Sequence, residues 1–351
     1  MMTSRLSRRM LMKSTAVSVA LALPEATRAQ APHDGVFLLT NHTASAITFL
    51  DGETFEQLDV APSPWGIALA PTDRAYISSA QVLTIVDAAN RQIVEQISYR
   101  TPIESVGYGE YRSGGMGIAA TPDGKWVAVG IHMNGSNGLV ELYDVEAGKF
   151  VATVPVGWRP FDVVASPDSS FVYSIDHDSF TITAIDLATQ TGTTVDAAPL
   201  GYGEFDKPHY AAVRSDGMLL LPYVGRLLWM LDPVAGTTAS LPMTADTHQH
   251  GITLSDDEST AYIVGTGPAG PAPGPPSLTV LDLETGEEQI ILLELPHEQV
   301  ALTADGATAN LTGGYTFANG GWDGITIVDL ASGEFSTREI SGQPLAIERL
   351  S

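Results

Sequence analysis

The sequence contains no cysteine. Disulfide bonds and thiolate metal sites are therefore excluded, and so is haem c, which is attached through a Cys-x-x-Cys-His segment. Any metal site in this chain has to use nitrogen and oxygen ligands, such as imidazoles and carboxylates. A glycine-rich loop that follows a strand and opens a helix is also missing, so a nucleotide cofactor is not expected.

Basic residues are scarce. The 351 residues include 17 lysines and arginines against 41 aspartates and glutamates, which gives a formal net charge of −24. Nucleic acids and anionic membranes attract basic surfaces, so we expect neither as a partner. Solubility or a salty habitat is the simplest explanation of the acidic surface.

Near its start the chain has an apolar stretch that is too short to cross a membrane. Ser14 to Leu23 is ten residues long, whereas a spanning helix needs about 20, so we expect no membrane insertion. The preceding SRRMLMK (Ser7 to Lys13) resembles the twin-arginine export signal, which carries proteins that fold before export. We expect a signal over residues 1–29, cleavage after Ala29 or Ala31, and one domain over residues 30–351 in the periplasm or outside the cell.

An aspartate that ends a strand-like segment recurs along the chain at intervals of 36 to 57 residues. The seven positions are Asp51, Asp87, Asp144, Asp186, Asp232, Asp282 and Asp329. Each unit divides into four short strands rich in Val, Ile, Ala and Tyr, with Gly, Asp and Pro at the turns. Repeats of this length that contain only strands predict an all-β, seven-bladed β-propeller with four antiparallel strands per blade.

The two ends of the chain predict how the ring closes. QPLAIERLS at the C-terminus matches an innermost strand with nothing after it, and DGVFLLTNH matches a second strand with nothing before it. We therefore expect the last strand to complete the first blade, which leaves no open sheet edge.

One repeat resembles a known family. TNHTASAITFLD (Thr40 to Asp51) is similar to the Y-V-T-N-x-x-x-N-x-V-x-V-I-D repeat of bacterial YVTN (surface-layer-like) β-propellers, and PFDVVASPDSSFVYSIDHDSFTITAID follows the same pattern. The resemblance implies the fold over the whole mature chain. It does not select an activity, because related propellers include binding proteins, lactonases, haem d1 proteins and copper enzymes.

Histidines gather at one predicted rim. We call "upper rim" the face where the innermost strands start and the second strands end. His42, His132 and His177 lie at ends of second strands, and His209, His248, His250 and His297 lie at or just before innermost strands. The segment GYGE, which contains Glu110 and then Glu204, occurs twice in loops that lead to innermost strands of the same rim. Loops on a rigid scaffold commonly carry binding sites.

The strongest candidate metal site comes from three consecutive blades. Its predicted ligands are His209, Asp246, His248, His250, His297 and Glu298. His248 and His250 are two residues apart, which on a strand puts both imidazoles on one side. Such a donor set suits Zn²⁺ or Cu²⁺. The secondary candidates are His42, Glu110, His132, His177 and Glu204. The alternative is that these histidines only cap loops and hydrogen-bond to carbonyls.

Other residues of the same rim are candidates for binding a small ligand. Arg112, Arg159 and Lys207 lie in loops that enter innermost strands and could bind an anion, although local ion pairs are the simpler interpretation. Trp65 occupies the position equivalent to His209 and could form an apolar wall, or belong to the core.

Two classes of function remain open from the sequence. One is a metal-binding or metal-delivery protein that serves a periplasmic transporter. The other is an enzyme, either a copper redox enzyme or a protein that resembles lactonases or handles haem d1. A metal-free platform for protein interactions is a third possibility. Delivery is favoured over redox chemistry because the chain has no cupredoxin domain and no haem c of its own for electron transfer.

Overall fold

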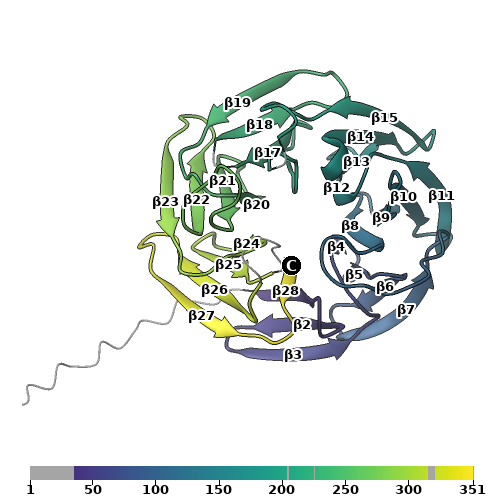
Figure 1. Cartoon of the computed structure of the whole chain (residues 1–351). Helices are drawn as coiled ribbons and strands as arrows, with labels where there is room; N and C mark the ends of the chain where they lie inside the picture. Colours follow the sequence, from purple (N-terminus) through teal and green to yellow (C-terminus); the bar gives the residue numbers. More distant parts are fainter. Residues whose placement is uncertain (1–34, 204, 225, 315–320, 351) are drawn as a thin grey trace, which may run out of the picture. The chain divides into compact units, whose positions relative to one another are not determined.

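The computed structural model describes residues 35–203, 205–224, 226–314 and 321–350. They form seven four-stranded antiparallel sheets arranged in a ring around one axis, a seven-bladed β-propeller (Figure 1). The predicted fold is therefore confirmed. The predicted export signal and Glu204 lie outside the described residues.

The strands follow one order in every blade, from the axis outward. Blade 1 contains β28 (Pro344–Leu350), β1 (Val36–Asn41), β2 (Ala46–Asp51) and β3 (Thr54–Asp59). Blade 2 contains β4 (Ile67–Ala70), β5 (Arg74–Ser78), β6 (Val82–Asp87) and β7 (Gln92–Ser98). Blade 3 contains β8 (Gly114–Ala120), β9 (Trp126–His132), β10 (Leu139–Asp144) and β11 (Lys149–Pro155). Blade 4 contains β12 (Pro160–Ala165), β13 (Phe171–Asp176), β14 (Thr181–Asp186) and β15 (Thr191–Asp196), with a short 3₁₀ helix, η1 (His177–Ser179), between β13 and β14.

The remaining three blades keep this order. Blade 5 contains β16 (Ala212–Val213), β17 (Leu219–Tyr223), β18 (Leu227–Leu231) and β19 (Thr238–Pro242). Blade 6 contains β20 (Gln249–Leu254), β21 (Thr260–Gly265), β22 (Ser277–Asp282) and β23 (Glu288–Leu292). Blade 7 contains β24 (Val300–Leu302), β25 (Thr308–Thr312), β26 (Gly324–Asp329) and β27 (Phe335–Glu339). The described residues contain no helix long and apolar enough to cross a membrane.

The recurring aspartates end the third strand of each blade or directly follow it. Six of their carboxylates accept hydrogen bonds from backbone N–H groups of the next turn, as Asp87 does from Asn90 and Asp144 does from Ala147. The same bond to the residue three positions ahead recurs at Asp186, Asp232, Asp282 and Asp329. Aspartate repeats in the sequence because its short side chain replaces a backbone acceptor in this turn.

The core consists of layers between neighbouring blades. Second and third strands are buried along nearly their whole length, whereas the outermost strands are mostly exposed, as β2 and β3 illustrate. Each cluster of buried side chains joins adjacent sheets; one, for example, packs Val140 of blade 3 against Val163 of blade 4. Burying one such side chain stabilises the fold by roughly 1.5–3 kcal/mol.

The ring closes between its first and last strands. β28 pairs with β1 in antiparallel register, with Val36 opposite Leu350 and Leu39 opposite Ile347. In Figure 1 the yellow end of the chain lies inside the purple first blade. The predicted closure is confirmed.

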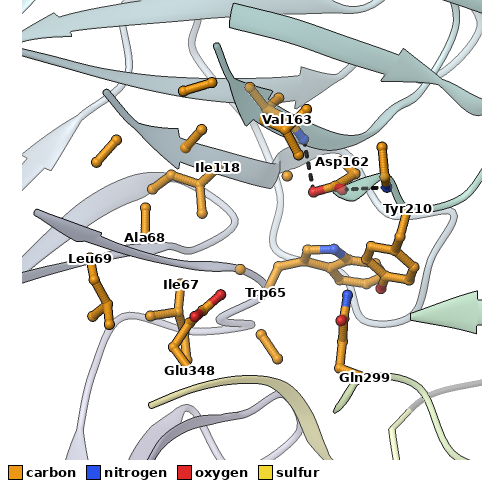
Figure 2. A pocket seen from close by; sticks show the side chains of 18 of the residues that line it. Trp65, Ile67, Ala68, Leu69, Ile118, Asp162, Val163, Tyr210, Gln299 and Glu348 are labelled. Carbon is orange, nitrogen blue, oxygen red and sulfur yellow. Dashed lines mark hydrogen bonds between the residues drawn. The ribbon is translucent and has the colours of Figure 1, made fainter. Parts of the chain in front are cut away.

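Large side chains at or just before the innermost strands of six blades pack together in one buried cluster, and Figure 2 shows Trp65 and Tyr210 among them. We call "plug" the residues Trp65, Met116, Phe161, Tyr210, Ile252 and Leu345, which belong to six different blades and are all buried. Each lies in, or a few residues before, an innermost strand. Through Phe161 and Tyr210 the plug contacts His177 and His250 of the rim.

Candidate metal centre

Three imidazoles of blades 5 and 6 converge on one point of the upper rim. His209, His248 and His250 each offer one ring nitrogen, and the three nitrogens lie within 4.8 Å of one another. His209 precedes β16, His248 precedes β20 and His250 lies in β20. The rings of His209 and His250 stack at 4.2 Å between centroids. These three are the predicted ligands that the structure brings together.

A fourth imidazole approaches from blade 4. Nε2 of His177 lies 3.0 Å from Nε2 of His209. Two ligand nitrogens on a tetrahedral Zn²⁺ would be about 3.3 Å apart, given Zn–N distances of about 2.0 Å. His177, which the sequence placed only among the secondary candidates, therefore lies close enough to His209 to bind the same metal ion. We call the four residues His177, His209, His248 and His250 the "histidine cluster".

The imidazole of His250 is held by a buried carboxylate. Its Nδ1–H donates to Oε1 of Glu298 at 2.9 Å, and the hydroxyl of Tyr210 donates to the same oxygen at 2.8 Å. Glu298 is fully buried, and its other oxygen has no hydrogen-bond partner among the described residues. Glu298, predicted as a ligand, is thus placed behind His250, whose Nε2 is left available.

A second carboxylate holds His177. Nδ1 of His177 donates to Oδ1 of Asp178 at 3.0 Å, and Nζ of Lys207 donates to the same oxygen at 2.8 Å. Nε of Arg159 donates to Oδ2 of Asp178 at 2.7 Å. The guanidinium of Arg159, itself fully buried, lies 3.9 Å from the ring centre of Tyr111. Arg159 and Lys207, predicted to bind an anionic ligand, therefore form ion pairs with a carboxylate of the protein.

Burial keeps most of these imidazoles neutral. Desolvation lowers the pKa of His177 to about 3 and lowers the pKa values of His209 and His248 well below the ordinary value. His250 differs: burial acts in the same direction, but the charge and hydrogen bond of Glu298 more than offset it and raise its pKa. Neutral imidazole is the form that binds a metal ion.

One nitrogen of the cluster has no partner. Nε2 of His248 is shielded from solvent and forms no hydrogen bond with any residue that the structure describes. A buried polar atom without a hydrogen-bond partner lowers the stability of the fold, so such an atom is rarely left without a function. A ligand that binds this nitrogen would supply it.

Glu110 adds a carboxyl group beside the cluster. Its side chain is buried, and burial raises its pKa, with Arg159, His250, Glu298 and Asp178 as its charged neighbours. It lies in the loop between β7 and β8. Glu204, from the second GYGE segment, lies outside the described residues.

The remaining predicted histidines are held by other parts of the rim. Nδ1–H of His42 donates to the Pro64 carbonyl and its Nε2 accepts from the Gly109 N–H. Nδ1 of His132 donates to the carbonyl of Arg112. Nε2 of His297 lies 2.7 Å from the hydroxyl of Thr326. These three histidines thus hydrogen-bond to neighbouring parts of the rim, which is the role that the alternative interpretation gives them.

Asp246, Arg112 and Trp65 are also placed outside the cluster. Asp246 is exposed and has a left-handed backbone, with φ of 46°. The guanidinium of Arg112 donates to the carbonyls of Ser63, Ser113 and Gly115, which places it in the framework of the rim. Trp65 belongs to the plug.

Sequence reasoning missed Asp178 and Tyr210. Asp178 directly follows His177 in DHDS, and Tyr210 directly follows His209 in PHY. A carboxylate or hydroxyl next to a histidine was a usable signal, because metal-bound imidazoles usually donate their second N–H to such a group.

Comparisons with known proteins identify the fold. No protein-family model and no curated protein matches the sequence. A hydrazine synthase structure from Kuenenia stuttgartiensis matches with a TM-score of 0.60 and 16% identity, over 92% of this chain and 100% of that chain. Dihydro-heme d1 dehydrogenase NirN, in complex with DHE, gives 0.60 and 16%, over 93% and 77%. A functionally unknown protein from Desulfotomaculum acetoxidans gives 0.61 and 13%, over 90% and 98%. At these identities the likeness shows a shared fold and no shared activity.

Proposed function

We propose that this seven-bladed propeller binds one Zn²⁺ or Cu²⁺ ion in the histidine cluster and delivers it to another protein. The observation that carries the proposal is the convergence of His209, His248 and His250 on one point, with His177 Nε2 beside them. Imidazole nitrogen suits both metals, and the donor set contains no sulfur that would favour other ions.

The hydrogen bonds behind the cluster support a metal site. Metal-binding histidines usually donate their other ring N–H to a carboxylate, which fixes the tautomer and makes the free nitrogen a better ligand. His250 has this arrangement with Glu298 and His177 has it with Asp178. Both imidazoles therefore present Nε2 toward the cluster.

The number of imidazoles favours holding a metal over using it in a reaction. Catalytic zinc sites keep one coordination position open for water or substrate, whereas closed sites use four protein ligands. If His177 joins His209, His248 and His250, the four imidazoles would complete a tetrahedral shell.

An enzyme remains the second candidate, and one observation favours it. Within the part of the chain that the structure describes, His209, His248 and His250 form the group whose ring nitrogens meet within 4.8 Å, so a metal bound by these three alone would keep a fourth position open. A copper redox enzyme would use such a position. The role of His177 decides between the two.

Export and partner choice complete the proposal. The twin-arginine-like start of the chain supports transport of the folded protein to the periplasm, and the YVTN-like repeats support membership of that propeller family. In that compartment, a component of a metal transporter is the expected recipient of the ion.

The experiment that tests the proposal is metal analysis of the mature protein, purified without an affinity tag. We expect about one Zn or Cu per chain in the wild type and none in His209→Ala/His250→Ala. His132→Gln is the matched control, because His132 is buried at the same rim but bonds to a backbone carbonyl.

Two results would separate the alternatives. A wild-type protein that stays metal-free after incubation with Zn²⁺ and Cu²⁺ would overturn the metal site. A bound metal that reacts with substrate, and that the His177→Ala protein holds as tightly as the wild type, would favour the enzyme. Transfer of the ion to a purified metal-transport protein would support delivery.

A further inference from the structure

The loop between β9 and β10 of blade 3 contains two Asn-Gly pairs, Asn134–Gly135 and Asn137–Gly138. A third pair of the chain, Asn319–Gly320, lies outside the described residues. Asparagine is a thermolabile residue, because its side-chain amide can react with the backbone nitrogen of the residue that follows. Glycine in that next position hinders the reaction least, since it has no side chain. The two pairs of the loop share this chemistry, so their surroundings decide which of them reacts.

Asn134 and Gly135 are the exposed tip of a turn. The N–H of Ser136 donates to the carbonyl of Met133 at 3.3 Å, and Gly135 has φ of 77°, which favours glycine as the third residue of a turn. The N–H of Gly135 has no hydrogen-bond partner among the described residues, and nothing lies within 4 Å of the position that a Cβ would take there. The nitrogen of Gly135 is therefore free to approach the side chain of Asn134.

Gly138, by contrast, is held in the blade. Its N–H donates to the carbonyl of Gly157 at 2.8 Å, and its own carbonyl accepts from the N–H of Val156 at 3.0 Å. Gly138 is buried, and a Cβ at its position would collide with Cδ of Pro160. The nitrogen that would attack Asn137 is thus bonded and enclosed, so this pair can react only after the blade opens locally.

We infer that Asn134 is a site of spontaneous deamidation on the upper rim and that the fold protects Asn137. The backbone nitrogen of Gly135 attacks the side-chain carbonyl carbon of Asn134 and forms a new C–N bond. The side-chain nitrogen leaves as ammonia and takes up the proton that the Gly135 nitrogen loses. Water then opens the resulting succinimide ring at either carbonyl group, which gives aspartate or isoaspartate. Overall, one water is consumed and one ammonia is released.

The reaction changes both the charge and the backbone of the rim. Each event replaces a neutral amide with a carboxylate, two residues after His132 at the end of β9. Where isoaspartate forms, the main chain also gains one carbon atom, which the turn between Met133 and Ser136 has to accommodate. The inference involves no metal ion and is independent of the proposed function.

Peptide mapping by mass spectrometry tests the inference on the mature protein in a mildly alkaline buffer, with a folded sample and a sample unfolded in urea. In urea we expect both asparagines to deamidate at comparable rates, because each precedes a glycine. In the folded protein we expect Asn134 to react nearly as fast as in urea. Asn137 should react about tenfold more slowly than Asn134 or less, because a backbone hydrogen bond has to break first.

Asn134→Gln is the matched variant, since its longer side chain would have to close a larger ring. We expect it to remove most of the more acidic form that ion-exchange chromatography separates from the aged wild type. Three results would overturn the inference. Folded Asn134 could react as slowly as Asn137, which would show that the turn prevents the reaction. Folded Asn137 could react as fast as Asn134, which would show that the fold does not protect it. The acidic form could persist in Asn134→Gln, which would place the modification elsewhere.

Discussion

Nε2 of His177 and Nε2 of His209 face each other across 3.0 Å, although the two residues come from different blades. Both rings are neutral at pH 7, since burial lowers both pKa values. One Nε2–H therefore donates to the lone pair of the other. A metal ion could bond to both nitrogens once the proton on Nε2 of His209 has moved to Nδ1 of the same ring, which keeps the imidazole neutral.

The first prediction concerns this pair. We expect His177→Ala to keep one metal per chain but to change the visible absorption spectrum of bound Co²⁺, because water would replace one of four imidazole ligands. Absorption spectroscopy of the Co²⁺-substituted protein checks it. An unchanged spectrum would show that His177 is not a ligand.

The second prediction concerns the carboxylate behind His250. We expect Glu298→Gln to weaken metal binding by about 10- to 100-fold, the usual effect of losing the group that orients a ligand. Tyr210→Phe is the control, since it leaves the bond between Glu298 and His250 intact. Competition with a chelator of known affinity measures both. Equal affinities in the two variants would contradict the assigned role of Glu298.

The third prediction is a pH dependence of stability that arises from His42. Burial, assisted by the charge of Arg112, lowers the pKa of His42 from 6.5 to about 4. A group with a lowered folded-state pKa contributes stability above its unfolded pKa, and that stability is lost as the pH falls toward the folded value. We expect His42 to cost about 2 kcal/mol at pH 5 relative to pH 7.

Urea unfolding of the metal-free protein at the two pH values measures this loss. Because other groups also titrate, the useful quantity is the difference between the wild type and His42→Gln. The variant should lose less stability on acidification. A variant with the full wild-type pH dependence would exclude His42 as the source.

The fourth prediction concerns the ion pair of Arg159. Removing one partner of a buried pair leaves the other charge without compensation, so we expect Arg159→Met to lower the free energy of unfolding by about 3 kcal/mol. The control is Arg214→Met, because the Arg214–Asp216 pair is partly exposed and should cost less than about 1 kcal/mol. Chemical denaturation compares them. Equal losses of unfolding free energy in the two variants would mean that Lys207 alone compensates the charge of Asp178.

The fifth prediction concerns the plug. Leu345 is 1% exposed, and its truncation would leave a cavity on the axis. We expect Leu345→Ala to cost about 2–5 kcal/mol. Ile93→Ala, at a residue that is 36% exposed, should cost far less. Thermal unfolding of the two variants gives the comparison, and a similar loss in both would show that the plug is not tightly packed.

The fold could be predicted because its signals are local. Asp87 and Asp144 each accept a hydrogen bond from the third residue after them, so the turn that carries the repeat is specified within four consecutive residues. The placement of the histidines at one rim followed from strand order alone. Neither inference needed the packing between blades.

The composition of the site could be predicted only in part. His248 and His250 were recognisable as a pair because strand periodicity puts them on one side. The sequence does not say that blade 4 brings His177 against His209, because that distance depends on how two sheets pack. Asp246 lies outside the cluster, with an exposed side chain and a left-handed backbone that the sequence does not indicate.

The pairing of β28 with β1 also sets an order of events during synthesis. Blades 2 to 7 use consecutive strands, so their sheets can form as the chain emerges from the ribosome. The first blade cannot, because Val36 has to wait for Leu350, which is made more than 300 residues later. Pairings this distant in sequence are slow to form. The ring, and with it the rim that carries the histidine cluster, can therefore be complete only after β28 has been made.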